Sequence, residues 1–166
     1  MAHLEELISF KEEALRLIVT NPRIMQAVVN NEEDCFSSTV PNPGSYLYEN
    51  IFPYKYMLNE TEEEKKTYIT MDFANFGLVN VHFKDMTMAI YVITHKDLMR
   101  IRDDGHSKLR VDFILSELDK IFNRARGFGI GTLQFLGLQS IQVNNNYLGS
   151  GIMFETVEFN HAPERI

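Results

Sequence analysis

The sequence has a single cysteine, Cys35, among its 166 residues. One thiol cannot form a disulfide framework within the chain, and it cannot build a site that needs several thiolates. Basic residues are also scarce, since 16 lysines and arginines stand against 23 acidic residues, for a formal net charge of -7. This balance disfavours binding to phosphate backbones through charge. We therefore expect a protein of the cytosol with no electrostatic footprint for nucleic acid.

Long apolar runs are missing as well. No run approaches the ~18 residues that a membrane-spanning helix needs, and Glu5 and Glu6 stand where a signal peptide carries positive charge. Neither export nor membrane insertion is expected. With 45% hydrophobic residues, the chain can bury one core, and it is too short for two ordinary domains. We predict a single domain over residues 1–166.

The N-terminal segment, 1–30, is predicted to be helical. A first amphipathic helix follows from apolar residues at helical spacing. These are Leu4, Leu7, Ile8, Leu15 and Ile18. Asn21 suits the N-cap of a second, short helix and Pro22 its first position. Ile24, Met25 and Val28 would face the core from that second helix.

Residues 31–66 form a long irregular connection with an acidic run at 60–64 and a group of aromatic residues. The aromatic residues are Tyr46, Tyr48, Phe52, Tyr54 and Tyr56. A connection of this length inside a small domain usually has a function of its own or is disordered. The aromatic rings argue against disorder, because disordered segments are poor in them.

Residues 67–160 carry the strand patterns and the clearest helix. Alternating apolar residues at 68–73 and 79–83 predict two half-buried strands, and the nearly continuous apolar run 86–93 predicts a central strand covered on both faces. Residues 95–106 read as a polar loop. The stripe Val111, Ile114, Leu115, Leu118, Ile121 and Phe122 predicts a helix that ends near Gly127.

Two further strands are predicted at 133–143 and 152–159, joined by a turn of three asparagines at 144–146. The element order is therefore two helices, several strands, a helix and a closing hairpin. Because the helices are grouped apart from adjacent antiparallel strands, the pattern indicates an α+β fold. We expect a mainly antiparallel sheet with one long helix and the N-terminal helices packed on it.

No catalytic, cofactor-binding or metal residue is assigned. The glycine-rich segment 127–132 leaves a helix and enters a strand, which is the reverse of a phosphate-binding loop. His95, Asp103, Asp104 and His106 could offer metal ligands, but their spacing matches no established signature. Solvated loop residues would give the same pattern.

Two other candidates for chemistry have an ordinary interpretation beside the catalytic one. Cys35 would need a histidine and an orienting group close in space to act as a nucleophile, and a lone cysteine is more often inert packing. Asp72 and the acidic run 62–64 could supply paired carboxylates, but Lys65 and Lys66 adjoin the run. A solvated, charge-balanced loop fits that composition better.

The back of the predicted helix offers a contact surface. At about 100° per residue, Leu109 and Phe113 point away from the apolar stripe of this helix. Either a loop of the chain or a partner covers them. Together with Tyr46, Tyr48, Phe52, Tyr54 and Tyr56 they form the candidate interface, because aromatic residues are enriched at interface cores.

Several short phrases occur in order along residues 50–160. They are Phe-Pro-Tyr-Lys-Tyr at 52–56, Lys-Thr-Tyr-Ile-Thr at 66–70, Ile-Tyr-Val-Ile-Thr-His-Lys at 90–96, Arg-Val-Asp at 110–112, Phe-Gly-Ile-Gly at 128–131, Tyr-Leu-Gly at 147–149 and Phe-Asn at 159–160. In their order and their placement on the predicted elements, they resemble tailed-bacteriophage neck and tail-completion proteins, of which tail terminators are the best described. Residues 1–45 lie outside the likeness.

The resemblance implies a virion structural subunit without cofactor or enzymatic activity, made in the host cytoplasm. Such subunits form a homo-oligomeric ring, often a hexamer, which ends the tail tube, joins it to the head and lets DNA pass without specific binding. An alternative is another head–tail connector component, namely a stopper, adaptor or tube-like subunit. An alternative of another class is a small metal- or cysteine-dependent enzyme that uses His95, Asp103, His106 or Cys35.

Overall fold

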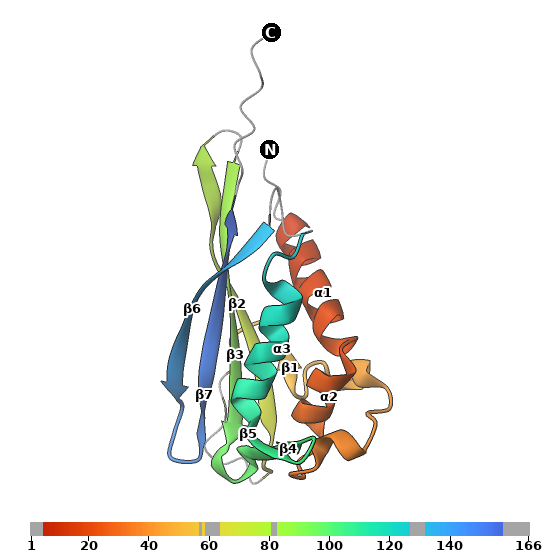
Figure 1. Ribbon diagram of the computed structural model, residues 1–166. Coiled ribbons are helices and arrows are strands. Elements are labelled where there is room, and N and C mark those ends of the chain that lie inside the picture. Colours follow the sequence, from red (N-terminus) through yellow and green to blue (C-terminus); the bar gives the residue numbers. More distant parts are fainter. Residues whose placement is uncertain (1–4, 57, 59–63, 81–82, 127–131, 158–166) are drawn as a thin grey trace.

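The computed structural model describes residues 5–56, 58, 64–80, 83–126 and 132–157, of which 75–80, 83–85 and 157 are described by their backbone alone. Three helices lie on one side of a five-stranded sheet (Figure 1). The helices are α1 (Glu5–Val19), α2 (Pro22–Val29) and α3 (Arg110–Phe122). This arrangement confirms the predicted α+β fold with a mainly antiparallel sheet.

The sheet has the strand order β1-β2-β3-β7-β6. Its strands are β1 (Ile51–Phe52), β2 (Thr67–Asn80), β3 (Phe83–His95), β6 (Thr132–Gln142) and β7 (Tyr147–Val157). Every pairing is antiparallel except that of the short β1 with β2. The central strand is β3, and both of its faces are buried over residues 88–90 and 92–95, as its continuous apolar run predicts.

The second helix follows from its local sequence. The Asn21 side chain accepts a hydrogen bond from the backbone N–H of Ile24, and Pro22 occupies the first turn, where no N–H is needed. All three predicted core residues, Ile24, Met25 and Val28, are buried. Asn30 ends the helix in an extended conformation.

The first helix buries only part of its predicted stripe, since Ile18 is buried and Leu15 packs against the core while other residues of the helix complete its inner face. Phe10, Ala14 and Ile18 are its buried residues, spaced four apart, whereas Ile8 is 60% exposed. The apolar side of α1 is wide enough to offer two stripes, and packing on α2 and the sheet selects the one through Phe10.

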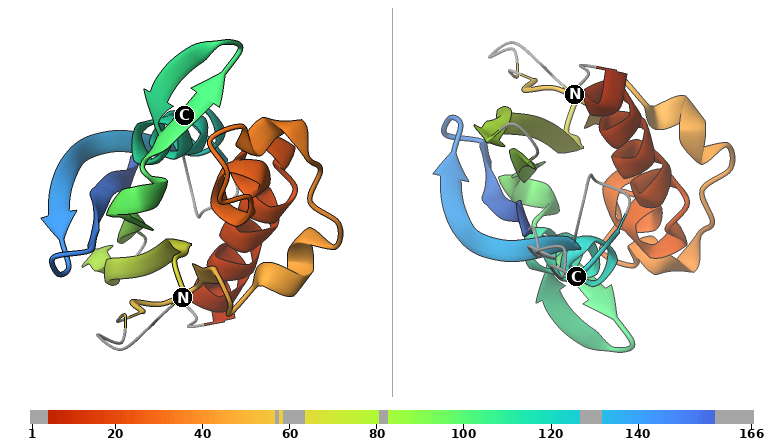
Figure 2. Two further views of the ribbon diagram at one scale, coloured as in Figure 1. Left: turned by 90° about the horizontal axis from the view of Figure 1, so that it is seen from below. Right: turned by 90° about the horizontal axis from the view of Figure 1, so that it is seen from above.

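The predicted loop at 95–106 is wrong. It contains a short 3-10 helix (Lys96–Leu98) and part of a two-stranded hairpin formed by β4 (Arg100–Asp103) and β5 (His106–Leu109). Asp104 and Gly105 supply the two positive φ angles of the tight turn. The hairpin projects from the body of the protein (Figure 2), and Ile101 is its single buried residue.

The irregular connection is attached to α2 through side-chain amides. Gln26 donates to the carbonyls of Phe36 and Ser38, at 3.2 and 2.9 Å. Asn30 donates to the carbonyls of Cys35 and Ser38, at 2.7 and 2.9 Å. Cys35 is thereby placed in the core at 0% exposure.

Arg110, the first residue of α3, is fully buried and joins three parts of the chain. Its guanidinium donates to the carbonyl of Leu98 at 2.7 Å, to that of Ala27 in the last turn of α2, and to those of Asn30, Asn31 and Glu32 at 2.8–3.3 Å. Within the described residues no carboxylate lies at salt-bridge distance. The negative end of the α2 dipole and the five carbonyls balance the charge instead.

We predict that Arg110→Met lowers the free energy of unfolding by about 3 kcal/mol or more, because it leaves five carbonyls without their donor. Urea unfolding followed by circular dichroism measures the change. Arg102→Met is the control, since Arg102 is about half exposed and its pair with Glu33 at 3.4 Å lies at the surface. It should change stability by less than about 1 kcal/mol. Equal stability of the two variants would contradict the role given to Arg110.

Candidate interaction surfaces

An aromatic cluster covers the face of the sheet opposite the helices. Its buried members are Phe52, Tyr68, Ile93 and Tyr147, with Tyr56 packed against them. The rings of Phe52 and Tyr56 stack at 3.9 Å with their planes 3° apart. This cluster brings the segment 52–56 onto β2, β3 and β7, on a face where the described part of the chain has no α-helix.

The predicted tyrosine segment is divided by the fold. Tyr48 and Tyr54 are 61% and 46% exposed, so they remain available to a partner. Phe52 is 3% exposed and belongs to the aromatic cluster. Tyr46 lies elsewhere, packed against the main core beneath the helices. A role in an interface stays a prediction for this segment, and Tyr48 and Tyr54 are the residues that could contact a partner.

The two residues predicted on the back of α3 also have different surroundings. Leu109 is 51% exposed, whereas Phe113 is only 7% exposed. The ring of Phe36 meets Phe113 edge-on at 4.8 Å, and the guanidinium of Arg23 lies 5.1 Å from the centre of the Phe113 ring. A loop of the chain therefore covers Phe113, which was one of the two alternatives.

Charges fix the β4–β5 hairpin to the helices at the same place. Asp103 of β4 accepts from Arg23 of α2 at 2.7 Å and from Lys108 of β5 at 2.9 Å. These two cations hold the pKa of Asp103 below its usual value. The Arg23 guanidinium also lies 4.3 Å from the ring of Phe36. Asp103 thus serves as an anchor of the hairpin.

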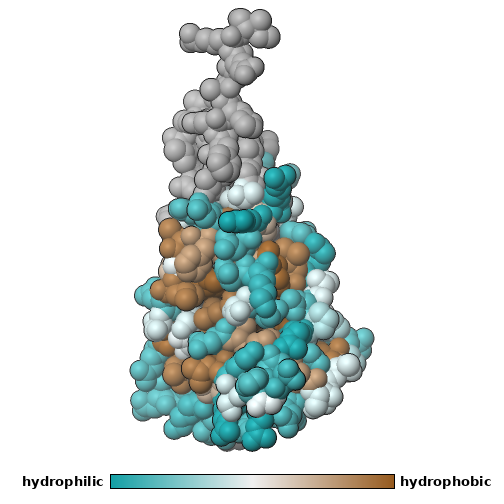
Figure 3. All heavy atoms as spheres, viewed as in Figure 1, coloured by the Kyte–Doolittle hydropathy of each residue, from teal (hydrophilic) through white to brown (hydrophobic). Residues whose placement is uncertain are grey.

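The surface along β6 carries exposed apolar residues, whose exposure their strand pattern did not predict. Phe135, Leu136 and Leu138 are 43%, 50% and 60% exposed, and Leu148 of the neighbouring β7 is 37% exposed. Figure 3 shows apolar side chains gathered on the side of the molecule that β6 and α3 form. The amino-acid composition could have indicated this surface, because β6 contains none of the charged residues or prolines that usually protect an exposed edge strand.

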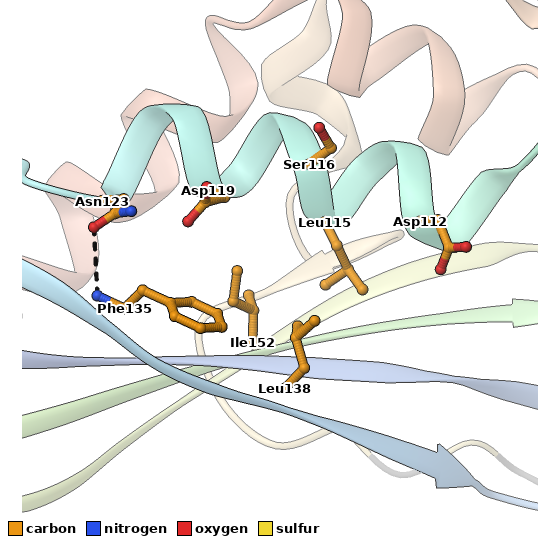
Figure 4. A pocket seen from close by; sticks show the side chains of 8 residues that line it. All are labelled: Asp112, Leu115, Ser116, Asp119, Asn123, Phe135, Leu138 and Ile152. Atoms are coloured by element: carbon orange, nitrogen blue, oxygen red, sulfur yellow. Dashed lines mark hydrogen bonds between the residues drawn. The ribbon is translucent and has the colours of Figure 1, made fainter.

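A groove of about 400 Å³ runs between α3 and β6. Leu115, Phe135, Leu138 and Ile152 form its apolar part, and Asp112 and Asp119 of α3 extend toward the strands along its other side (Figure 4). The backbone N–H of Phe135 donates to the Asn123 side chain at 3.4 Å, which ties the start of β6 to the end of α3.

The outer edge of β6 is only partly covered. Leu133 exchanges backbone hydrogen bonds with Arg124 and Ala125 at 2.7 and 2.9 Å. From Gly137 to Gln142, β6 pairs with β7 alone among the described residues. The opposite edge of the sheet is also only partly covered. Among the described residues, β1 covers β2 at Ile69 and Thr70 alone, and β1 is itself bridged to Leu47 through Ile51. The sheet therefore presents two different open edges.

The candidates for metal binding have other contacts. Among the described residues, no group of three His, Cys, Asp or Glu side chains could hold a metal ion. The Nδ1 of His95, a largely buried residue, accepts from the backbone N–H of Asp97 at 3.1 Å, and the Tyr147 ring meets the imidazole edge-on. His106 is exposed on β5. No described helix is long and apolar enough to cross a membrane.

The structure describes only some of the residues considered for acid–base and phosphate chemistry. Asp72 pairs with Lys55 at 3.1 Å, and Glu64 pairs with Lys66 at 3.3 Å. Glu62, Glu63 and the glycine-rich segment 127–131 lie outside the described residues. Asp72 and Glu64 are thus each paired with a lysine rather than with a second carboxylate.

The fold and these surfaces define an α+β protein with open sheet edges and an uncovered apolar groove. A family model, YomW, matches residues 21–156, and the chain belongs to the YomW family. The family is phage-derived, so the match indicates a phage-associated protein. No curated protein and no solved structure matches the chain.

We predict that Phe113→Lys lowers the free energy of unfolding by about 3 kcal/mol or more, since it removes a buried ring and places a charge in the core. Leu109→Lys should change stability by less than about 1 kcal/mol, because Leu109 is already half exposed. Thermal and urea unfolding of the two variants compare them directly. Similar stability losses would mean that the two sites do not differ in burial.

We predict that Cys35 of the native protein reacts slowly with a thiol reagent such as dithionitrobenzoate. Burial raises the pKa of the Cys35 thiol, the largest influence on it, so less thiolate is present at any pH near 8 than in a free cysteine. In urea the reaction should become fast. Rapid reaction of the native protein would show that Cys35 is accessible and reactive, and would support the alternative of a cysteine-dependent enzyme.

Proposed function

We propose that this chain is a structural subunit of a tailed-phage virion, acting at the neck or tail end as one member of a homo-oligomeric ring. The observation that carries the proposal is the pair of open sheet edges on a member of a phage-derived family. A subunit with two different complementary surfaces assembles head-to-tail, and the contacts close into a ring when the rotation permits.

Strand polarity favours such a contact. The antiparallel strands β2, β3, β7 and β6 number four, so the first and the last run in opposite directions. A neighbouring subunit in the same orientation would then bring its β2 antiparallel to β6. The contact would repeat the geometry of the other ladders in the sheet, in which backbone N–H and C=O groups pair between strands.

The proposed role is that of a tail terminator or neck subunit that ends the tail tube and joins it to the head. The expected ring is a hexamer, with the phage tube and connector proteins as partners. Its action is geometric and needs no catalytic group or cofactor. The net charge of -7 suits a channel through which DNA passes without being held, since acidic walls repel phosphates.

We predict that the purified protein forms a closed oligomer and that Gln139→Lys weakens it. Gln139 is exposed in the open part of β6, and a lysine on an edge strand hinders pairing with another strand. Light scattering coupled to size exclusion gives the mass of each species, and electron microscopy shows whether it is a ring. Purified tube and connector proteins should be added in a second series.

Asn145→Lys is the matched control, because it adds the same charge at an exposed position in the turn beyond the edge. It should assemble like the wild type. A strictly monomeric wild-type chain, with and without the added phage proteins, would refute the ring. A ring that binds the connector but not the tube would favour a stopper or adaptor over a terminator.

A further inference from the structure

The helical layer stops short of the last strand of the sheet. Phe135 and Leu138 of β6 pair across from Phe154 and Ile152 of β7, so they share the face of the sheet on which the helices lie. Phe154 and Ile152 are buried, yet Phe135 and Leu138 are 43% and 60% exposed. The inner face of β6 is therefore apolar there, and none of the described helices covers it.

The spacing of helices and strands explains this gap. Packed helices lie about 8–10 Å apart, and neighbouring strands about 4.8 Å apart, so one helix covers roughly two strands. The described contacts place α3 mainly against β3 and β7. The next helical position falls over β6, where the groove lies. One more helix would complete the layer.

The other side of the groove is acidic. Asp112 and Asp119 point toward the strands from α3 (Figure 4), and neither has an ion-pair partner among the described residues. They are seven residues apart, which places them about 10.5 Å apart along the helix axis. A helix that lies alongside can match this interval with two basic residues at positions i and i+7.

We propose that this groove binds an amphipathic α-helix of a partner protein. The apolar stripe of that helix rests on Phe135 and Leu138, and two lysines or arginines seven residues apart meet Asp112 and Asp119. The proposal names the chemistry of a partner and stands on the groove alone. It does not depend on the ring, whose contacts lie in the plane of the sheet.

A second copy of this chain fits the groove poorly. Its longest described helix, α1, carries four glutamates against one lysine and one arginine, so it would meet the two aspartates with like charge. The helix α2 has only eight residues and is buried along most of its length. Charge therefore favours a helix from a different protein.

The test uses a fluorescent synthetic helix of 18 residues with leucines along one stripe and two lysines seven residues apart. A control peptide has glutamate in place of both lysines. Fluorescence anisotropy at low salt should show that the lysine peptide binds at least tenfold more tightly than the glutamate peptide. Amide shifts in ¹⁵N spectra should change along α3 and β6.

Variants of the protein separate the two parts of the contact. Asp112→Asn with Asp119→Asn should weaken binding of the lysine peptide about three- to tenfold and reduce its salt dependence. Glu12→Gln with Asp34→Asn removes two exposed charges elsewhere and should leave binding unchanged. Leu138→Asp should weaken binding of both peptides more than tenfold, and its unfolding curve should match that of the wild type because Leu138 is exposed.

Three results would overturn the proposal. They are no binding of the lysine peptide at about 1 mM, equal affinity for both peptides, or amide shifts away from α3 and β6. A lysine peptide that splits a preformed oligomer into monomers would show that a second copy occupies the groove instead. Gln139→Lys tests the ring contact at the edge of β6, and Leu138→Asp tests helix binding in the groove. If one of these two proposals fails, the result for the other still stands.

Discussion

The buried guanidinium of Arg110 is the interaction on which most of the helical layer depends. It joins the end of α2, the start of α3 and the segment before the β4–β5 hairpin through five carbonyls. Burial lowers the pKa of Arg110, yet an arginine keeps its charge, so the carbonyls must stay in place around it. A lysine could not reach all five acceptors, because it has three donors at a single point.

This constraint explains how the first part of the irregular connection is held against the helices. Asn31 and Glu32 give their carbonyls to Arg110, and the amides of Gln26 and Asn30 hold the next residues. Cys35 and Phe36 then cover the core beside α3. The connection is thus part of the helical layer, and its function includes closing the core over Phe113.

Local signals could be predicted from the sequence, and long-range ones could not. The cap at Asn21 and the two-sided burial of β3 need only neighbouring residues, and both are confirmed. The burial of Phe113 depends on Phe36, 77 positions away, which no helical period reveals. The β4–β5 hairpin lacks an apolar alternation because it packs through Ile101 alone, although Asp104-Gly105 is itself a hairpin signal.

The same reasoning separates the two candidate surfaces. A strand that is buried on one face and free at its edge needs apolar residues on the buried face. Charged residues on its other face would be tolerated, so burial alone does not explain why β6 has none. Native edge strands usually carry lysine or proline, which block further pairing, and β6 has neither. The uncharged edge of β6 therefore suits pairing with a strand in the plane of the sheet. Its exposed leucines suit contact with a helix that packs over the sheet. The two aspartates, Asp112 and Asp119, lie on the α3 side of the groove. Their charge can therefore select the partner that binds the groove without affecting strand pairing at the edge of β6.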